Sequence, residues 1–244
     1  MQNNEIMISY GDQADEMVKE LLSKIKIEKE LSKDDLIALK PNLINATESE
    51  QGATTDPDLV KGMIEYLQEK EFNNIIIMEG SWVGADTVNA FQKCGYEDIS
   101  KKYNIPLYNL QKANYTVKQV EGMDIEIADK ALEIDYLINL PVLKGHCQTT
   151  ITCALKNLKG CISNREKRRF HRTGLHQSIA YLNKALKQDL IIVDGIYGDL
   201  DFEEGGNPVK MNRVIVGQDP VLIDSYAASL LGYSNEEVNY IKLA

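Results

Sequence analysis

Residues 35–42 read DLIALKPN and residues 75–81 read IIIMEGS. Each stretch contains a short apolar run that stops at a polar or glycine-bearing turn, as a strand buried on both faces of a parallel sheet does. Between them, Asp56-Pro57 supplies a helix cap with proline in the first turn, and apolar residues follow at helical spacing up to Leu67. This strand, helix, strand order predicts an α/β fold.

The same alternation continues on both sides of this stretch. We expect further strands at 5–10, 136–140, 190–193 and 212–216, and further helices at 15–25, 149–158, 174–187 and 221–231. Strands and helices in this order form a mostly parallel sheet with helices on both faces. Residues 115–128 alternate with a period of two, which predicts a small antiparallel insertion, within about 111–130, that turns at Glu121-Gly122.

Length and composition limit the class of protein. We predict a single α/β domain over residues 1–244, with a further C-terminal segment missing because the pattern stops at Ala244. With 27 basic and 37 acidic residues the net charge is -10, which disfavours nucleic acid and anionic membranes as partners. No apolar run approaches the roughly 20 residues of a membrane span, and the N-terminus lacks the pattern of a signal peptide. We therefore predict a cytoplasmic protein.

Chemically versatile residues cluster between Lys144 and His176. This segment holds all three histidines and three of the four cysteines. Cys147, Cys153 and Cys161 form neither the close pairs of a zinc ribbon nor a ferredoxin run, so the sequence contains no self-contained iron-sulfur motif. The cysteines are expected to be free thiols in a reducing compartment.

The three histidines offer two kinds of chemistry. His146 follows a buried strand, where an imidazole serves as a general base or metal ligand, or simply bonds to the backbone. His171 and His176 are five positions apart and do not share one face of a helix. They converge only if His171 lies in the loop before a helix that His176 opens. A metal held by His146, His171 and His176 is therefore one alternative.

An anion site is the other expectation for this segment. Thr149 and Thr150 lie at the start of the predicted helix 149–158, whose free N-H groups, with Lys144, Lys156 and Lys159 nearby, suit a phosphate or carboxylate. Lys156 is either solvated or, in a cleft with other cations, an anion clamp or nucleophile of lowered pKa. The basic run 165–172 is either a solvated face or a clasp for a polyanion.

Polar residues also follow the other predicted strands. Lys40 and Asn42, then Glu79, and later Asp194 lie at the ends of apolar runs. A parallel sheet brings the carboxyl ends of its strands to one edge, where α/β proteins bind their ligands. We expect these side chains to meet His146 there.

Taken together, these residues resemble the family called domain of unknown function 362. The matching features are Lys40-Pro41-Asn42-Leu43, Glu79-Gly80, Leu140-Pro141-Val142-Leu143-Lys144 with His146, Lys156-Asn157-Leu158-Lys159-Gly160, His171, Asp194-Gly195, and Asp219-Pro220 with Asp224. Some members of that family carry an appended ferredoxin-like iron-sulfur domain, a cysteine-rich segment that this chain lacks. The resemblance implies a fold and a site, and a separate iron-sulfur protein as one candidate partner.

A fainter similarity links the chain to the lactate racemase family. That family has a lysine at a sheet end and, about fifteen residues later, a histidine near a nickel-bearing, nicotinate-derived cofactor. Lys156 and His171 have this spacing. The surrounding glycine-rich and proline-bearing pattern is not matched, so the cofactor is not carried over and the identity of any cofactor stays open.

The sequence favours an enzyme that binds a small anionic metabolite or a nucleotide-like cofactor at the carboxyl edge of the sheet. Lys144, Lys156 and Asn157 would hold the anion, and His146 or His171 would move a proton. One alternative is a metal- or iron-sulfur-linked redox protein that acts with a separate partner. The other is a non-catalytic module that binds a ligand without turnover.

Overall fold

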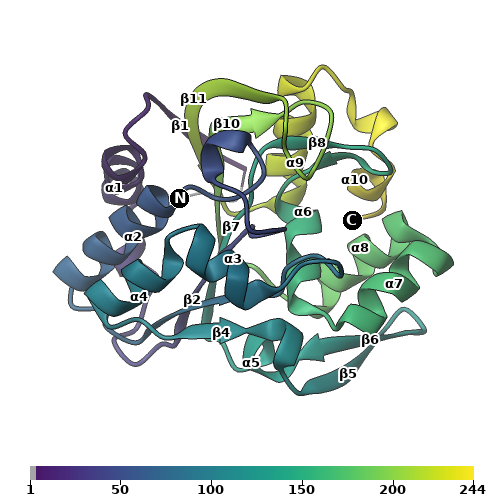
Figure 1. Ribbon diagram of the computed structural model, residues 1–244, viewed down its shortest axis with the longest axis horizontal. Coiled ribbons are helices and arrows are strands. Elements are labelled where there is room, and N and C mark those ends of the chain that lie inside the picture. Colours follow the sequence, from purple (N-terminus) through teal and green to yellow (C-terminus); the bar gives the residue numbers. More distant parts are fainter. Residues whose placement is uncertain (1–3) are drawn as a thin grey trace.

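The fold is built on a seven-stranded sheet in the order β1-β11-β10-β7-β2-β3-β4, seen in the computed structural model, which describes residues 4–244 (Figure 1). The strands are β1 (Ile6–Tyr10), β2 (Ile37–Pro41), β3 (Ile75–Glu79), β4 (Leu107–Asn109), β7 (Tyr136–Leu140), β10 (Leu190–Asp199) and β11 (Pro208–Gly217). The pairs from β10 to β4 are all parallel, and β11 is antiparallel to both of its neighbours. The predicted mostly parallel sheet is confirmed.

Helices cover both faces of this sheet, as predicted (Figure 1). One face carries α1 (Ala14–Ile25), α2 (Pro57–Glu69), α3 (Thr87–Lys93) and α4 (Tyr96–Tyr103). The other carries α5 (Asp129–Leu132), α6 (Ala154–Asn157), α7 (Asn164–Thr173), α8 (Leu175–Ala185), α9 (Pro220–Leu230) and α10 (Asn239–Leu243). Within residues 4–244, no helix has both the length and the apolar character that a membrane crossing needs.

The central strands contain continuous apolar runs because helices cover both faces of the sheet. Leu39 and Ile77 point into the core shared with α1 and α2, whereas Ala38 and Ile76 point into the core shared with α6 and α8. Successive side chains of a strand point to opposite faces, so a strand buried on both faces cannot alternate apolar with polar residues. The central strands are therefore recognisable from sequence.

Two short antiparallel hairpins accompany the main sheet. The first joins β5 (Tyr115–Val120) to β6 (Met123–Ala128) through Glu121 and Gly122, both with positive φ, which confirms the predicted insertion and its turn. The second joins β8 (Lys144–His146) to β9 (Thr150–Thr152). Three-residue strands of this kind leave little signal in the sequence.

The predicted helix 149–158 is wrong in its first half. Thr150 to Thr152 form β9, which pairs with β8 so that Lys144 faces Thr152. β-branched residues such as threonine favour strands over helices. Helix α6 begins only at Ala154 and continues as the 3-10 turn Leu158–Cys161.

The start of α6 is capped by a buried carboxylate from another helix. Asp224 of α9 is fully buried and accepts hydrogen bonds from the backbone N-H groups of Ala154 (2.7 Å) and Leu155 (3.2 Å). Burial raises the pKa of Asp224 to about 7. These N-H groups were expected to meet a ligand anion; instead, Asp224 occupies that place.

Replacing this carboxylate should destabilise the fold. We expect Asp224→Ala to lower the free energy of unfolding by about 2–4 kcal/mol, because it leaves two buried N-H groups without an acceptor. The matched control is Asp219→Ala in the same helix, which removes an N-cap and should cost about 1 kcal/mol. Urea denaturation measures both. Equal losses for the two variants would show that the Asp224 contacts contribute no more than an ordinary cap.

Candidate functional site

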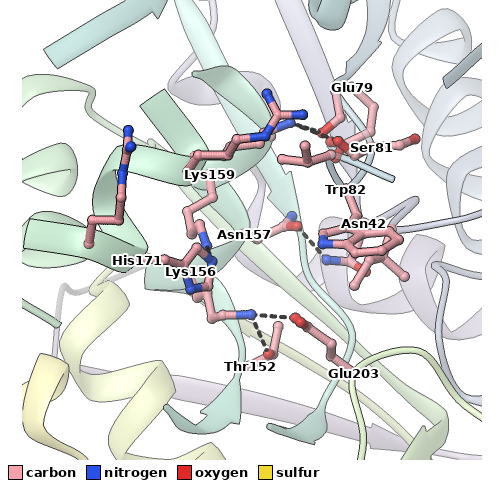
Figure 2. Close-up of a pocket in the computed structure, with 17 residues that line it drawn as sticks. Asn42, Glu79, Ser81, Trp82, Thr152, Lys156, Asn157, Lys159, His171 and Glu203 are labelled. Carbon is pink, nitrogen blue, oxygen red and sulfur yellow. Dashed lines mark hydrogen bonds and ion pairs between the residues drawn. The ribbon is translucent and has the colours of Figure 1, made fainter. Parts of the chain in front are cut away.

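A cavity of about 480 Å³ opens at the carboxyl ends of β2 and β3. Asn42 directly follows β2, and Glu79 is the last residue of β3. The remaining walls come from the loops after these strands, from α6 and the turn that follows it, from α7, and from the 201–207 loop. Figure 2 shows the lining side chains, which are Asn42, Ile44, Glu79, Gly80, Ser81, Trp82, Val83, Thr152, Lys156, Asn157, Lys159, Gly160, Lys167, Arg168, His171, Arg172 and Glu203.

A buried ion pair lies at the base of the cavity. Lys40 is fully buried, and its Nζ contacts Glu79 Oε2 and donates to Pro41 O at 3.1 Å. Burial raises the pKa of Glu79, while the adjacent Lys40 opposes that rise. Gly160 lies directly against the pair, since a Cβ there would be 2.5 Å from Glu79 Oε1 and 2.7 Å from Lys40 Nζ. Only glycine fits at this position without a shift of the ion pair.

A chain of buried amides fixes the neighbouring wall. Lys144 Nζ donates to Asn42 Oδ1 (2.9 Å), and Asn42 Nδ2 donates to Asn157 Oδ1 (2.8 Å). Asn157 Nδ2 in turn donates to Asn139 Oδ1 at 2.7 Å. Every donor meets an acceptor, so the network holds β2, β7 and α6 in one arrangement. Asn42 and Asn157 are thereby presented to the cavity.

Lys144 lies behind this wall and not on it. Its ammonium donates to Asn42, to Ala53 O (2.5 Å) and to Glu203 O (2.8 Å), which uses its three N-H bonds. Burial lowers the pKa of Lys144 to about 7. Its position fits a role in holding two loops together, and it is not among the residues that line the cavity.

Glu203 connects the lysine and the histidine that the sequence analysis singled out. Its carboxylate accepts from Lys156 Nζ at 2.6 Å and lies 2.9 Å from His146 Nε2 (Figure 2 draws the lysine contact). Burial opposes ionisation of Glu203, but Lys156 and His146 outweigh burial and hold its pKa well below the usual range. Burial lowers the pKa of Lys156.

Both ring nitrogens of His146 have close polar neighbours, although only Nδ1 makes a well-aligned hydrogen bond. Nδ1 accepts from the backbone N-H groups of Gln148 (2.9 Å) and Thr149 (3.1 Å), so Nε2 carries the proton and faces Glu203. Burial lowers the pKa of His146. His146 therefore orients Glu203 from behind, and it does not line the cavity.

Lys159 and His171 form a second pair at the mouth of the cavity. Lys159 Nζ lies 3.1 Å from His171 Nε2. Burial, reinforced by the charge of Lys156, lowers the pKa of Lys159 to about 7, and burial together with Lys159 lowers that of His171 to about 4. The imidazole is thus neutral at pH 7 and accepts from Lys159. His171 lies within α7, not in a loop before a helix as the metal alternative required.

The basic run 165–172 forms α7, and its cations divide between two environments. Arg165 and Arg169 pair with Glu126 and Glu166 away from the cavity. Lys167, Arg168 and Arg172 line the cavity. Lys167 is buried, donates to Gly80 O (2.8 Å) and Ser81 O (2.7 Å), and has its pKa lowered by burial to about 8.

Besides Lys40, Lys144 and His146, which lie behind the cavity wall, four more residues expected at the site do not line the cavity. Thr149 is buried, and Thr150 donates to Glu237 O. Asp194 is buried and accepts from the N-H of Asp56 (2.7 Å), where it holds the start of α2. His176 stacks on Tyr240 with ring centroids 6.2 Å apart.

The three-histidine metal site is not assembled in this arrangement, because His146 bonds to the backbone and His176 lies against Tyr240. Across the described part of the chain, no three histidine, cysteine, aspartate or glutamate side chains are grouped so as to hold a metal. The cavity instead brings together Asn42, Glu79, Lys156, Asn157 and His171 from the sequence prediction.

Sequence reasoning did not single out Trp82 or Glu203, and it treated Lys167 only as a member of the basic run 165–172. Lys167 and His171 are four positions apart, so helical spacing within the basic run would have placed them on one face. Glu203 belongs to the acidic loop 201–207, which is far from Lys156 in sequence, and no local pattern links the two. Trp82 follows Glu79-Gly80-Ser81, which was expected at the carboxyl edge of the sheet. Its position in the sequence could therefore have placed it near the site.

Comparisons with solved structures agree with this fold. The lactate racemase apoprotein from Thermoanaerobacterium thermosaccharolyticum superposes with a TM-score of 0.53 at 16% identity, over 89% of this chain and 55% of that one. A Thermotoga maritima protein of known crystal structure gives 0.51 at 13% identity, over 93% of this chain and 60% of that one. At these identities the likeness concerns the fold, and it matches the distant similarity expected from the sequence.

Sequence comparison identifies the family. A thylakoid-associated protein of Synechocystis sp. is 28% identical over 192 residues, which are 75% of this chain and 57% of that protein. The chain thus spans little more than half the length of that curated relative. The model of the family described as domain of unknown function (DUF362) matches residues 37–229, a range that includes every residue lining the cavity. The chain belongs to the DUF362 family.

Proposed function

We propose that the protein is an enzyme that binds a small anionic ligand in this cavity and moves a proton on it with Lys159 and His171. The observation that carries the proposal is the excess of cations on the cavity walls. Five cationic residues, Lys156, Lys159, Lys167, Arg168 and Arg172, line it together with two carboxylates, Glu79 and Glu203. Both carboxylates already have partners, because Glu79 contacts Lys40 and Glu203 contacts Lys156.

The unpaired cations support an anionic ligand. Among residues 4–244, no carboxylate oxygen lies within 4.0 Å of the charged groups of Lys159, Lys167, Arg168 or Arg172. A partly buried lysine without a counterion is disfavoured in its charged form, which is why the pKa of Lys159 falls to about 7. A bound phosphate or carboxylate would supply the missing charge. The concentration of positive charge is local, since the whole chain has a net charge of -10.

The Lys159 and His171 pair supports proton transfer. A general acid or base works best when its pKa lies near the working pH, and that of Lys159 does. His171 Nε2, 3.1 Å away, accepts a hydrogen bond from the ammonium and orients it. The spacing that suggested lactate racemase places Lys156 and His171 on the same cavity, but Lys156 is ion-paired with Glu203 and Lys159 is the lysine in contact with His171.

The non-catalytic binding module and the metal alternative are supported by different features of the structure. A non-catalytic binding module would use the same cavity and cations without turnover, and the second experiment below separates it from an enzyme. The metal alternative has no grouped ligands within the described residues, as noted above. A cytoplasmic location and a separate iron-sulfur protein partner stay predictions from the sequence.

Removing the Lys159 charge should weaken anion binding. We expect Lys159→Met to reduce affinity for inorganic phosphate by about 10- to 100-fold, the range for loss of one charge-assisted hydrogen bond. Lys101→Met is the matched control, since Lys101 is exposed on α4, lies outside the cavity and carries the same charge. Isothermal titration calorimetry at low salt measures both. Equal affinities for Lys159→Met and wild type would contradict an anion site at Lys159.

Proton transfer is tested without knowing the reaction. We expect protein in D₂O to exchange a carbon-bound proton for deuterium in at least one of a panel of sugar phosphates, 2-oxo acids and nucleoside monophosphates, followed by NMR. His171→Gln should slow that exchange by about 10²–10⁴-fold while affinity changes little, because the imidazole orients the proton donor. Gln177→Ala, an exposed change in the neighbouring helix, is the control. If the protein binds compounds of the panel but exchanges deuterium into none of them, the result would favour the non-catalytic module.

A further inference from the structure

Trp82 forms the aromatic part of the cavity wall. Figure 2 shows it across the cavity from Lys156 and His171. Its side chain is 48% exposed, which is unusual for a tryptophan in a loop already packed against the sheet edge. An exposed indole on a cavity wall that also carries cations suits a ligand with both an apolar face and a negative charge.

The backbone of the loop that carries Trp82 is held in place without any ligand. The backbone N-H of Trp82 donates to Ile44 O at 3.0 Å, and Gln111 Nε2 donates to the backbone carbonyls of Trp82 (3.2 Å) and Ala85 (3.0 Å). One side of the ring packs directly on Gly84, where a Cβ would lie 2.0 Å from the ring atom Cζ3. Only glycine allows this close contact, and the residue stays 48% exposed with its backbone held by the loop.

A fixed aromatic surface of this kind recognises planar groups. Bases stack on aromatic side chains with little dependence on their identity, because every base has a π-face. The opposite wall supplies cations suited to a phosphate, namely Lys159 and Lys167 with Arg168 and Arg172. The cavity volume of about 480 Å³ falls in the range of roughly 300–1,000 Å³ typical of small-molecule sites.

We propose that the ligand is a planar heteroaromatic phosphate of the nucleoside monophosphate class, with its ring against Trp82 and its phosphate against the Lys159 and Lys167 wall. This inference rests on the proposed anion site and narrows it. A simple carboxylate or sugar phosphate would use the cations and leave the indole uncovered. Trp82 is then the residue that sets specificity for the ring.

Four probes separate the two contributions. Calorimetry with inorganic phosphate, ribose 5-phosphate, AMP and adenosine compares the phosphate alone, the phosphate with sugar, the complete nucleotide and the nucleoside. We expect AMP to bind at least about tenfold more tightly than ribose 5-phosphate, a difference of about 1.4 kcal/mol that stacking on one aromatic ring supplies. Trp82 is the only tryptophan of the chain, so AMP should also quench the intrinsic fluorescence.

Variants at Trp82 complete the test. Trp82→Ala should remove the preference for AMP and leave ribose 5-phosphate binding unchanged, whereas Trp82→Phe should keep most of the preference. Tyr108→Ala, which removes a partly exposed ring on β4, is the control, and circular dichroism verifies folding of each variant. Equal binding of AMP and ribose 5-phosphate would overturn the ring proposal and leave the anion site standing. Failure of both phosphates to bind would overturn the anion site itself.

Discussion

A buried ion pair, Lys40 with Glu79, is the interaction on which the arrangement of the site depends. It links the carboxyl ends of β2 and β3 at the base of the cavity, where Lys40 is fully buried and Glu79 almost fully. Burying two charges is costly, and leaving one of them unpaired would cost more still. The pair is accommodated because Gly160 has no side chain to displace it. That close approach also brings the turn after α6, with Lys159, to the cavity wall.

The remaining buried lysines share this physical problem and solve it differently. Lys144 and Lys167 meet neutral acceptors only, and Lys156 has the Glu203 carboxylate. Lys159, which is only partly buried, has no carboxylate partner and meets the imidazole of His171. The series leaves positive charge concentrated at the mouth of the cavity, and low-dielectric walls strengthen the attraction of such a cluster for an anion. A net negative chain thus presents one cationic site at the sheet edge.

The sequence indicates the fold well because β2, β3 and β7 are buried on both faces and therefore contain continuous apolar runs. Because each apolar run stops where its strand ends, the sequence also indicates which residues lie at the carboxyl edge of the sheet. Asn42 and Glu79 lie at that edge, as predicted. The sequence fails for β9, where three residues carry too little pattern to compete with a helix assignment. The roles of His146 and Asp194 depend on backbone groups brought close only by folding. Glu203 and Lys156 meet across 47 positions, a contact that local spacing cannot reveal.

The most direct test of the cationic site is an NMR titration of the lysine ammonium groups, with and without inorganic phosphate. The Lys159 resonance is identified by its absence from the spectrum of Lys159→Arg. In the free protein it should titrate near pH 7, because burial lowers the pKa of Lys159 to about 7. Phosphate favours the charged lysine, so it should raise that pKa, and phosphate affinity should correspondingly fall as the pH rises above 7. Lys144, enclosed by its three acceptors, should not respond. A Lys159 pKa that phosphate leaves unchanged would contradict the account.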